Sequence, residues 1–375
     1  MAKQRRQTRV SKPARARKTG GHKLRSKPRC RIAILGVGGA GNKIISQLVC
    51  NGMVGAQCTA INTDLKDLNS ADAVRKVLIG EKVTCGLSAG GNPETGKAAA
   101  HESRVLLESL VDNVDVAFVV VGVGGGTGTG AAPVVAEVAR SKGAAVVGVV
   151  ATPFNTDEYR SGFVADALNE MQRACDTIVV VDNDRILKSI HRLPPREACK
   201  LVDQSIANMI KGIVETLSEP SMINLDVADF KTIVKEGGIA AFSVGESDAP
   251  NRAEEAVQNA LSTSLLNVDY AGATGALIQV SGDPNMTIQE VDRVKELVED
   301  KMGRSARVAW GARVSPDREG SPKVTLVMTG VNSPHMSHGL RNMMRELYDI
   351  EQSQSESEKS LPIDLGLDQI ECFEE

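Results

Sequence analysis

Two glycine-rich segments of this sequence have the composition of phosphate-binding turns. GVGGAG at 36–41 and GGGTGTG at 124–130 each follow an apolar run and precede a helical pattern. Glycine lets a backbone approach a phosphate closely, and a helix that begins at such a turn offers unpaired N–H groups and a favourable dipole. The hydroxyls of Thr127 and Thr129 can add hydrogen bonds to phosphate oxygens. Two such turns indicate a mononucleotide polyphosphate held from both sides.

The first turn alone also fits another class of protein. GxGxxG after a strand is typical of NAD(P)-dependent oxidoreductases, and Asp64 lies about where their ribose-binding carboxylate is found. The second glycine–threonine turn disfavours this alternative, and the sequence shows no evident constellation of catalytic His, Lys or Tyr residues.

The elements around these turns predict an α/β domain. Strands alternating with helices are typical of a doubly wound, mainly parallel sheet. We expect strands at 31–35, 58–62, 116–121, 145–150 and 177–181, and helices at 42–51, 95–110, 131–142 and 160–174.

A long helix and a second domain are predicted after this. The helical pattern at 196–217 is bounded by prolines, and we expect it to connect the two domains. The smaller domain is expected to be α+β. Its predicted strands are 238–245, 276–281, 306–314 and 324–331, and its predicted helices are 251–267 and 287–302.

The two turns belong to a set of motifs that carries a family resemblance. GGGTGTG followed by AAPVVAEVA resembles the signature of the tubulin/FtsZ superfamily, in its FtsZ branch, and the details resemble an archaeal version. The similarity extends over residues 31–332. The other matching segments are GVGGAGN at 36–42, NTD at 62–64, AGGNPE at 89–94 and NLDVAD at 224–229.

This resemblance implies a function. It implies a cytoplasmic, GTP-dependent, polymerising cytoskeletal protein of cell division that forms a dynamic filament or a ring at the mid-cell septum. A scaffold that binds GTP without hydrolysing it is a second hypothesis, disfavoured by the intact NLDVAD segment. A tubulin-like paralogue acting in cell shape is a third, and the AGGNPE and NLDVAD segments favour the division branch.

The resemblance also implies the binding residues for GTP or GDP, with Mg²⁺ held by the nucleotide phosphates. It implies phosphate contacts for the first and second turns, γ-phosphate contacts for the 89–94 segment, and a nucleotide contact for Asn62 of the 62–64 motif. The residues are Gly38, Gly39, Asn42, Asn62, Gly124, Gly125, Gly126, Thr127, Gly128, Thr129 and Gly130, with Gly90, Gly91 and Asn92 facing the γ-phosphate.

Guanine and ribose contacts follow from the same resemblance. Asn183 would contact guanine, and Asp203 would accept hydrogen bonds from its N1–H and amine, which selects guanine over adenine. Arg160 matches the ribose-contacting arginine of the family. The ribose carboxylate stays open between Asp157 and Glu158, because the stretch lacks the usual Phe-Glu-Gly.

Asn224, Asp226 and Asp229 are the candidate catalytic residues. Carboxylates in a solvated loop would be the ordinary reading of this group. It follows the central helix, on the side away from the phosphate turns, so it is not expected to reach its own nucleotide. The resemblance implies that it enters the site of the next subunit in a head-to-tail polymer and orients water. Ser221 after Pro220 departs from the usual Pro-Gly, which makes the backbone entering this segment less permissive.

Charge is distributed unevenly along the chain. Residues 1–31 carry thirteen Lys/Arg and no acid, and the remainder carries 31 basic and 47 acidic groups, a net charge of −16. Such an arm suits anionic membrane or nucleic acid, and an unstructured solubilising extension is the alternative. We predict a basic disordered arm (1–30), a GTP-binding domain (31–220), a C-terminal domain (221–332), a linker (333–360) and a tail peptide (361–375).

The tail peptide is predicted to bind division proteins or a membrane anchor. Ile363, Leu367, Ile370 and Phe373 recur at helical spacing with acids between them. Seven scattered cysteines without a CxxC pair indicate reduced thiols, and five histidines without ligand spacing give no metal signal. We expect neither a transmembrane helix nor a signal peptide.

Overall fold

The computed structural model describes residues 30–154, 163–183, 194–218, 222–223, 225–235, 237–262, 268–303, 306–314 and 321–331. The first part of the chain alternates strands with helices, as predicted. It holds β1 (Ile32–Val37), α1 (Gly38–Cys50), β2 (Ala56–Asn62), α2 (Leu65–Ser70), β3 (Arg75–Leu78), α3 (Glu81–Thr84), α4 (Pro93–Glu102), α5 (Arg104–Leu110), β4 (Val116–Gly122), α6 (Gly126–Ser141), β5 (Ala145–Ala151), α8 (Val164–Ala174), β6 (Thr177–Val181) and α10 (Pro195–Ser218).

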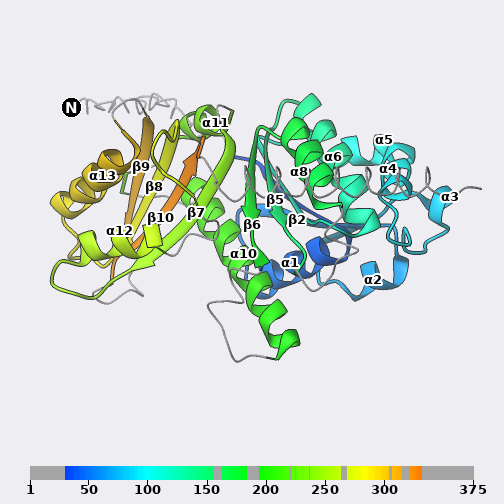
Figure 1. The fold of residues 1–375 in the computed structure, drawn as a ribbon, viewed down its shortest axis with the longest axis horizontal. Helices are drawn as coiled ribbons and strands as arrows, with labels where there is room; N and C mark the ends of the chain where they lie inside the picture. Colours follow the sequence, from blue (N-terminus) through cyan, green and yellow to red (C-terminus); the bar gives the residue numbers. More distant parts are fainter. Residues whose placement is uncertain are drawn as a thin grey trace, which may run out of the picture.

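The second part adds an antiparallel section to the same sheet. Its elements are α11 (Val227–Lys235), β7 (Gly238–Glu246), α12 (Arg252–Ser262), β8 (Gly275–Gly282), α13 (Ile288–Met302), β9 (Arg307–Val314) and β10 (Lys323–Thr329). The described strands form one ten-stranded sheet in the order β3-β2-β1-β4-β5-β6-β7-β10-β8-β9 (Figure 1). All pairs from β3 to β7 are parallel, whereas β10 runs antiparallel to β7 and β8. The doubly wound, mainly parallel fold is therefore confirmed.

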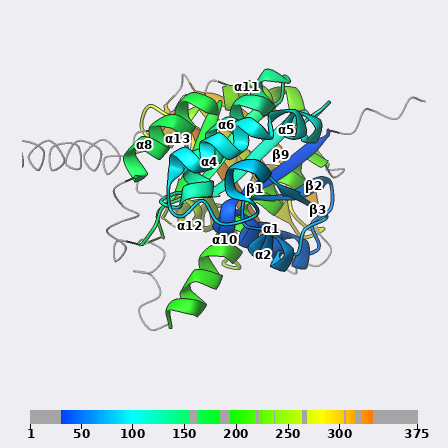
Figure 2. The same ribbon diagram turned by 90° about the vertical axis from the view of Figure 1, so that its right-hand side faces the viewer.

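Alternation along the strands places an apolar layer on each face of the parallel section. Ala33, Leu35 and Val37 of β1 belong to the core beneath α4, α5, α6 and α8, whereas Ile32 and Ile34 belong to the core beneath α1 and α10. Figure 2 shows these two groups of helices on opposite sides of the sheet. Strands buried on both faces read as continuous Val/Ile runs, which explains why the sequence predicted them well.

The two glycine-rich turns meet where the strand order reverses. β1 lies between β2 and β4, and Val37 pairs with Val121 at the carboxyl ends of β1 and β4. The chain enters α1 directly after β1 and α6 soon after β4. In open α/β sheets this reversal opens a crevice at the carboxyl ends of the strands, where ligands bind.

A ladder of amide side chains fixes the long helix α10 against α1. Gln47 Nε2 donates to Gln204 Oε1 at 2.8 Å, and Asn51 Nδ2 donates to Asn208 Oδ1 at 3.3 Å. Lys211 Nζ adds a bond to the carbonyl oxygen of Asn51 at 2.6 Å. These contacts place the middle of α10 beside α1, and α10 runs between the two groups of strands (Figure 1).

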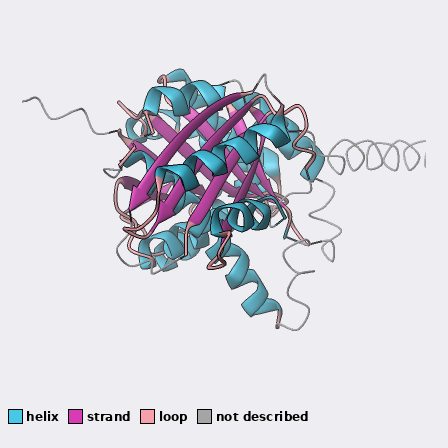
Figure 3. Cartoon of the chain, turned by 90° about the vertical axis from the view of Figure 1, so that its left-hand side faces the viewer, coloured by secondary structure: helices cyan, strands magenta, loops and turns pink. Residues whose placement is uncertain are grey.

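The antiparallel section has its own apolar core. α12 and α13 pack on its strands through small and β-branched residues such as Ala256, Val257 and Val294, and Figure 3 shows helices crossing the strands at this end of the molecule. The amino end of α13 is fixed by a capping box between Thr287 and Glu290.

Several predicted boundaries were wrong. The predicted helix 95–110 is two helices, α4 and α5, because Ser103 interrupts it. α6 begins at Gly126, five residues before the predicted start, so most of the second glycine turn is helical. α11 covers residues that were expected in the catalytic loop, and the short α2, α3 and β3 were missed. Short elements lack the periodicity on which such a prediction depends.

Several predictions fall on residues that the structure leaves undescribed. The basic arm (1–30, of which only residue 30 is described), the linker (333–360) and the tail peptide (361–375) are among them. The end of the predicted helix 251–267 and the start of 160–174 also lie there, and the domain limits stay predictions. No helix among the described residues is long and apolar enough to cross a membrane.

Candidate active site

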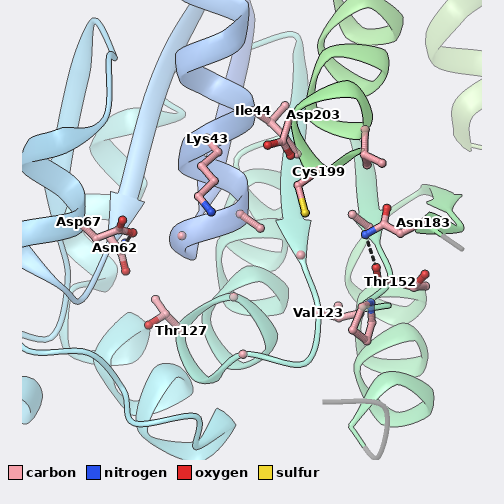
Figure 4. A pocket seen from close by; sticks show the side chains of 18 of the residues that line it. Lys43, Ile44, Asn62, Asp67, Val123, Thr127, Thr152, Asn183, Cys199 and Asp203 are labelled. Atoms are coloured by element: carbon pink, nitrogen blue, oxygen red, sulfur yellow. Dashed lines mark hydrogen bonds between the residues drawn. The ribbon is translucent and has the colours of Figure 1, made fainter. Parts of the chain in front are cut away.

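A cavity of about 600 Å³ opens at the carboxyl ends of the parallel strands (Figure 4). It lies at the reversal of the strand order, between the two glycine turns and the first turns of α10. Eight of the residues predicted to bind nucleotide line it: Gly39, Asn62, Gly125, Gly126, Thr127, Gly128, Asn183 and Asp203. Residues far apart in the sequence therefore share one cavity.

The two glycine turns are in direct backbone contact. Gly38 has a φ of +73°, and a Cβ at this position would lie 2.9 Å from the backbone nitrogen of Gly128. Only glycine fits this conformation and this approach. The second turn is closed by a hydrogen bond from the Gly124 N–H to Thr129 Oγ1 at 2.9 Å. The amino ends of α1 and α6 thus converge on the same space, which suits a chain of phosphates.

A third segment, residues 88–92, borders the same end of the cavity. A Cβ on Gly126 would lie 2.8 Å from the backbone nitrogen of Asn92, so this segment packs directly on the second turn. Gly90 and Gly91 both have positive φ, at +64° and +77°. The Asn92 side chain accepts from the Glu94 N–H at 2.9 Å and thereby caps α4. The segment therefore packs beside the phosphate end of the cavity, in a conformation that favours glycine at two adjacent positions.

A polar network at the end of β2 supports the phosphate end. Asn62 Nδ2 donates to Asp67 Oδ2 at 2.7 Å, and the hydroxyls of Thr63 and Thr127 lie 2.7 Å apart. Asp64 accepts from the Lys66 and Asp67 N–H groups and so begins α2. The network ties the predicted 62–64 motif to the second glycine turn.

The opposite end of the cavity is suited to a base. Asp203 on α10 and Asn183 after β6 face the same space, with Phe154 and Cys199 beside them. Asn183 Nδ2 donates to the carbonyl oxygen of Thr152, whereas its buried Oδ1 has no partner within the described part of the chain. Burial raises the pKa of Asp203 to about 6, although the nearby Lys43 opposes the shift. Among the residues that the structure describes, none donates a hydrogen bond to this half-buried carboxyl group, so a ligand in the cavity can donate to it.

Other predicted residues surround the cavity without lining it. Asn42 is 2% exposed, and both polar atoms of its side chain lack partners among the residues described. Arg160, Asp157 and Glu158 lie outside the described residues. The cavity lining also omits Gly38, Gly90, Gly91, Asn92, Gly124, Thr129 and Gly130, which belong to the turns and segment beside it.

The sequence motifs missed several residues of the lining. Lys43 projects from α1, Asp67 from α2 and Cys199 from α10, and Ser88, Thr152 and Phe154 come from loops. Helical spacing could have indicated two of them, because residues three or four apart share a helix face. Cys199 lies one turn before Asp203, and Asp67 lies one turn after Asp64. The other positions follow only from the fold.

The predicted catalytic carboxylates lie elsewhere. Asp226 Oδ1 accepts from the Ala228 N–H at 3.1 Å at the start of α11, and Asp229 occupies the first turn of that helix. Both are exposed, and Asn224 lies outside the described residues. Asp229 lines a second cavity of about 440 Å³, with Trp310 of β9 among its other lining residues.

The region around Asp229 and the nucleotide cavity lie at opposite ends of the parallel strands. Asp115, which precedes β4, accepts the backbone N–H of Arg31 at 3.0 Å and lies 3.3 Å from Lys231 Nζ of α11. α11 is therefore tied to the amino ends of β1 and β4, whereas the glycine turns follow their carboxyl ends. Seven residues of β4 span about 20 Å. Asp229, in the first turn of α11, therefore cannot reach the cavity of its own chain.

No group of three or more His, Cys, Asp or Glu side chains that could hold a metal ion occurs among the residues described. Asp64 and Asp67 nevertheless add carboxylates to the phosphate end of the cavity. Mg²⁺ prefers oxygen ligands and retains several waters. A hydrated ion carried by the phosphates fits this donor set, whereas a cage made only of side chains does not.

The fold and the cavity define a nucleotide-binding protein of the doubly wound α/β class. The family model "Tubulin/FtsZ family, GTPase domain" matches residues 31–191, and "FtsZ family, C-terminal domain" matches residues 238–332. "Cell division protein FtsZ 2" of Methanocaldococcus jannaschii is 44% identical over 309 residues, 82% of this chain and 81% of the relative. The protein of the same name from Haloferax volcanii is 42% identical over 303 residues, 81% of this chain and 76% of the relative.

A solved structure agrees with this relationship. "FtsZ dimer, empty (M. jannaschii)" superposes with a TM-score of 0.76 at 40% sequence identity, and the match covers 80% of this chain and 88% of the other. The chain belongs to the tubulin/FtsZ family, in its FtsZ branch. It is a GTPase of the cell-division type that binds guanine nucleotide, and the oxidoreductase alternative is thereby excluded.

Proposed function

We propose that this GTPase is active at the junction between two subunits of a head-to-tail filament. The observation that carries the proposal is the separation of Asp229 from the cavity by the length of β4. One subunit binds GTP between its glycine turns. The next subunit presents Asn224, Asp226 and Asp229 to the γ-phosphate of that GTP.

Within the cavity, the residues divide by the part of the nucleotide that they bind. The turns at 36–42 and 124–130, with Asn62, hold the phosphates through backbone N–H groups and the Thr127 and Thr129 hydroxyls. Gly90, Gly91 and Asn92 face the γ-phosphate. Asp203 and the unpartnered Oδ1 of Asn183 bind guanine, and Arg160 binds ribose.

Hydrolysis requires a water molecule in line with the bond between the γ-phosphorus and the β–γ bridging oxygen. The carboxylates of Asp226 and Asp229, with the Asn224 amide, orient this water. The water oxygen bonds to phosphorus, the bridging oxygen leaves on GDP, and a proton is lost to solvent. Positioning and electrostatics supply the rate enhancement, as in other phosphoryl transfers. We propose that Mg²⁺ is held by the nucleotide phosphates and neutralises charge on the leaving group.

The junction makes assembly part of the enzymatic activity. A contact between two different surfaces of the same chain is heterologous, so it propagates into a filament instead of closing as a dimer. The exposed side chains of Met222, Leu65 and Leu87 are suited to burial in such a contact. We propose that the filament acts at the mid-cell division site in the cytoplasm.

The two terminal segments are proposed to bind other partners. Residues 361–375 would bind division proteins or a membrane anchor, and the basic arm would bind anionic membrane or nucleic acid, with up to about 1 kcal/mol per Lys or Arg near a membrane. Removing residues 1–26 should leave the GTPase rate unchanged but abolish salt-sensitive co-sedimentation with anionic liposomes or DNA. Equal co-sedimentation of the full and shortened chains would contradict this role.

Complementation between two inactive variants tests the shared site. Gly126→Asp blocks nucleotide binding but retains Asp229, whereas Asp229→Ala binds nucleotide but lacks the carboxylate. A mixture should regain phosphate release from GTP that neither variant shows alone, and ATP should give none. If pelleting shows that Gly126→Asp co-assembles with Asp229→Ala and the mixture stays inactive, the shared site is contradicted.

A further inference from the structure

The charged side chains around the nucleotide cavity are mostly of the wrong sign for a phosphate ligand. Among the described residues that line it, the charged ones are Asp64, Asp67, Asp203 and Lys43. Three carboxylates and one ammonium group thus face a ligand that carries several negative charges. The backbone N–H groups of the turns, and the Mg²⁺ proposed to be held by the phosphates, would compensate part of this repulsion. The single cation of the described lining therefore has a large electrostatic effect.

Lys43 is placed to reach the ligand. It follows Asn42 on α1, and its neighbours Asn42 and Ile44 are buried while Lys43 itself is exposed to the cavity. In Figure 4 its side chain extends from α1 along the cavity, and its nitrogen points toward the second glycine turn. Within the described part of the chain, Lys43 makes no hydrogen bond or ion pair, so no protein group competes for its ammonium.

The position along α1 indicates which phosphate the ammonium meets. Lys43 is five residues beyond Gly38, a rise of about 7.5 Å from the start of the helix, which lies at the phosphate end of the proposed nucleotide site. It is also close enough to Asp203 to influence that carboxyl group. Lys43 thus lies between the terminal phosphates and the base, where the α-phosphate of a nucleotide must be.

We propose that Lys43 is a phosphate-binding residue whose ammonium pairs with the α-phosphate of the bound guanine nucleotide. This inference rests on the proposed nucleotide site and deepens it. A charge-assisted hydrogen bond to a phosphate oxygen is among the stronger polar contacts in proteins. Lys43 offsets the three carboxylates and fixes the nucleotide midway between its two anchored ends.

The assignment has a specific consequence for different ligands. GTP, GDP and GMP all carry an α-phosphate, and guanosine carries none. Loss of the ammonium should therefore weaken all three nucleotides by a similar factor and leave guanosine unaffected. A purely structural effect of the substitution would instead weaken guanosine together with the nucleotides.

Equilibrium binding to Lys43→Gln, Lys43→Arg and wild type tests the proposal, at protein concentrations too low for assembly. Lys43→Gln should weaken GTP, GDP and GMP by about 10-fold, and Lys43→Arg should stay within a few-fold of wild type. The loss should shrink at high salt, because screening already removes part of the attraction in wild type. Lys66→Gln is the matched control, since Lys66 is exposed on the neighbouring α2 and does not line the cavity.

The outcomes separate this inference from the proposed site. GDP binding by Lys43→Gln equal to wild type would overturn the role of Lys43 while leaving the site intact. Equal losses in Lys43→Gln and Lys43→Arg, or a matching loss of guanosine, would show that shape and not charge matters, which also overturns the proposal. Failure of wild type to bind GTP would instead contradict the nucleotide site itself.

Discussion

The two ends of the parallel strands differ in almost every property that matters for chemistry. At the carboxyl ends, glycine turns, helix amino ends and the buried Asn183 Oδ1, which has no partner among the described residues, converge on a cavity. At the amino ends, Asp226 and Asp229 are exposed at the start of α11. The carboxyl ends are suited to binding a ligand, whereas the exposed carboxylates at the amino ends are accessible to another molecule. Asp229 and the glycine turns line different cavities, and we therefore propose that one chain carries both halves of an active site but cannot combine them.

The largest effect on GTP turnover is expected from a substitution at the amino ends of the strands. Asp229→Ala should lower GTP turnover by roughly 10²-fold or more, because the attacking water loses a positioning group. GTP binding should remain, because the altered residue does not line the cavity of its own chain. Phosphate release and equilibrium nucleotide binding measure the two properties separately.

The same variant should still assemble. Trp310 is the only tryptophan in the chain and lines the second cavity with Asp229, so its fluorescence reports on that surface. Asp292→Ala is a suitable control, because Asp292 is exposed on α13 and lines neither cavity. Wild-type turnover in Asp229→Ala would remove Asp229 from the catalytic group.

At the carboxyl ends, Asp203→Ala should act on selectivity. We expect the preference for GTP over ATP to fall roughly 10²-fold, because a carboxylate that pairs with the guanine N1–H and amine rejects adenine. Competition between the two nucleotides for the site measures this ratio. If the variant discriminates as well as wild type does, another group recognises the base.

A smaller effect should come from pH. Burial raises the pKa of Asp203 to about 6, so in the free protein this carboxyl group is protonated below that pH. Guanine donors need the ionised form, so GTP affinity should be constant above pH 7 and fall by up to about 10-fold per unit below pH 6. The raised pKa also means that the free energy of unfolding falls as pH rises from about 4 to 6, since the folded state then binds more protons.

Titration of GTP affinity against pH in wild type and Asp203→Asn checks this prediction. The variant has no carboxyl group at this position and should lose the pH dependence below 6. An identical profile in both proteins would assign the titration to another group.

The parts of the molecule also differ in how well the sequence predicted them. The buried strands β4 and β6 were found nearly to the residue, because continuous Val/Ile runs have few alternative structures. The motifs predicted the two glycine turns and the family resemblance implied Asp203, and parts of both turns and Asp203 line the cavity. Lys43, Ser88 and Thr152 had no motif, because their place in the cavity depends on how separate elements pack. α11 was missed since its nine residues are short and follow a segment that resembles a loop.

The central claim is that a complete active site exists only between two subunits, and the dependence of GTPase rate on protein concentration tests it most directly. A lone subunit binds GTP but lacks the carboxylates of a neighbour. The rate per subunit should therefore be near zero at low concentration, rise above a threshold and level off once most subunits have a neighbour. A rate per subunit that stays constant over the same range would show that one chain contains the whole site, and would contradict the account.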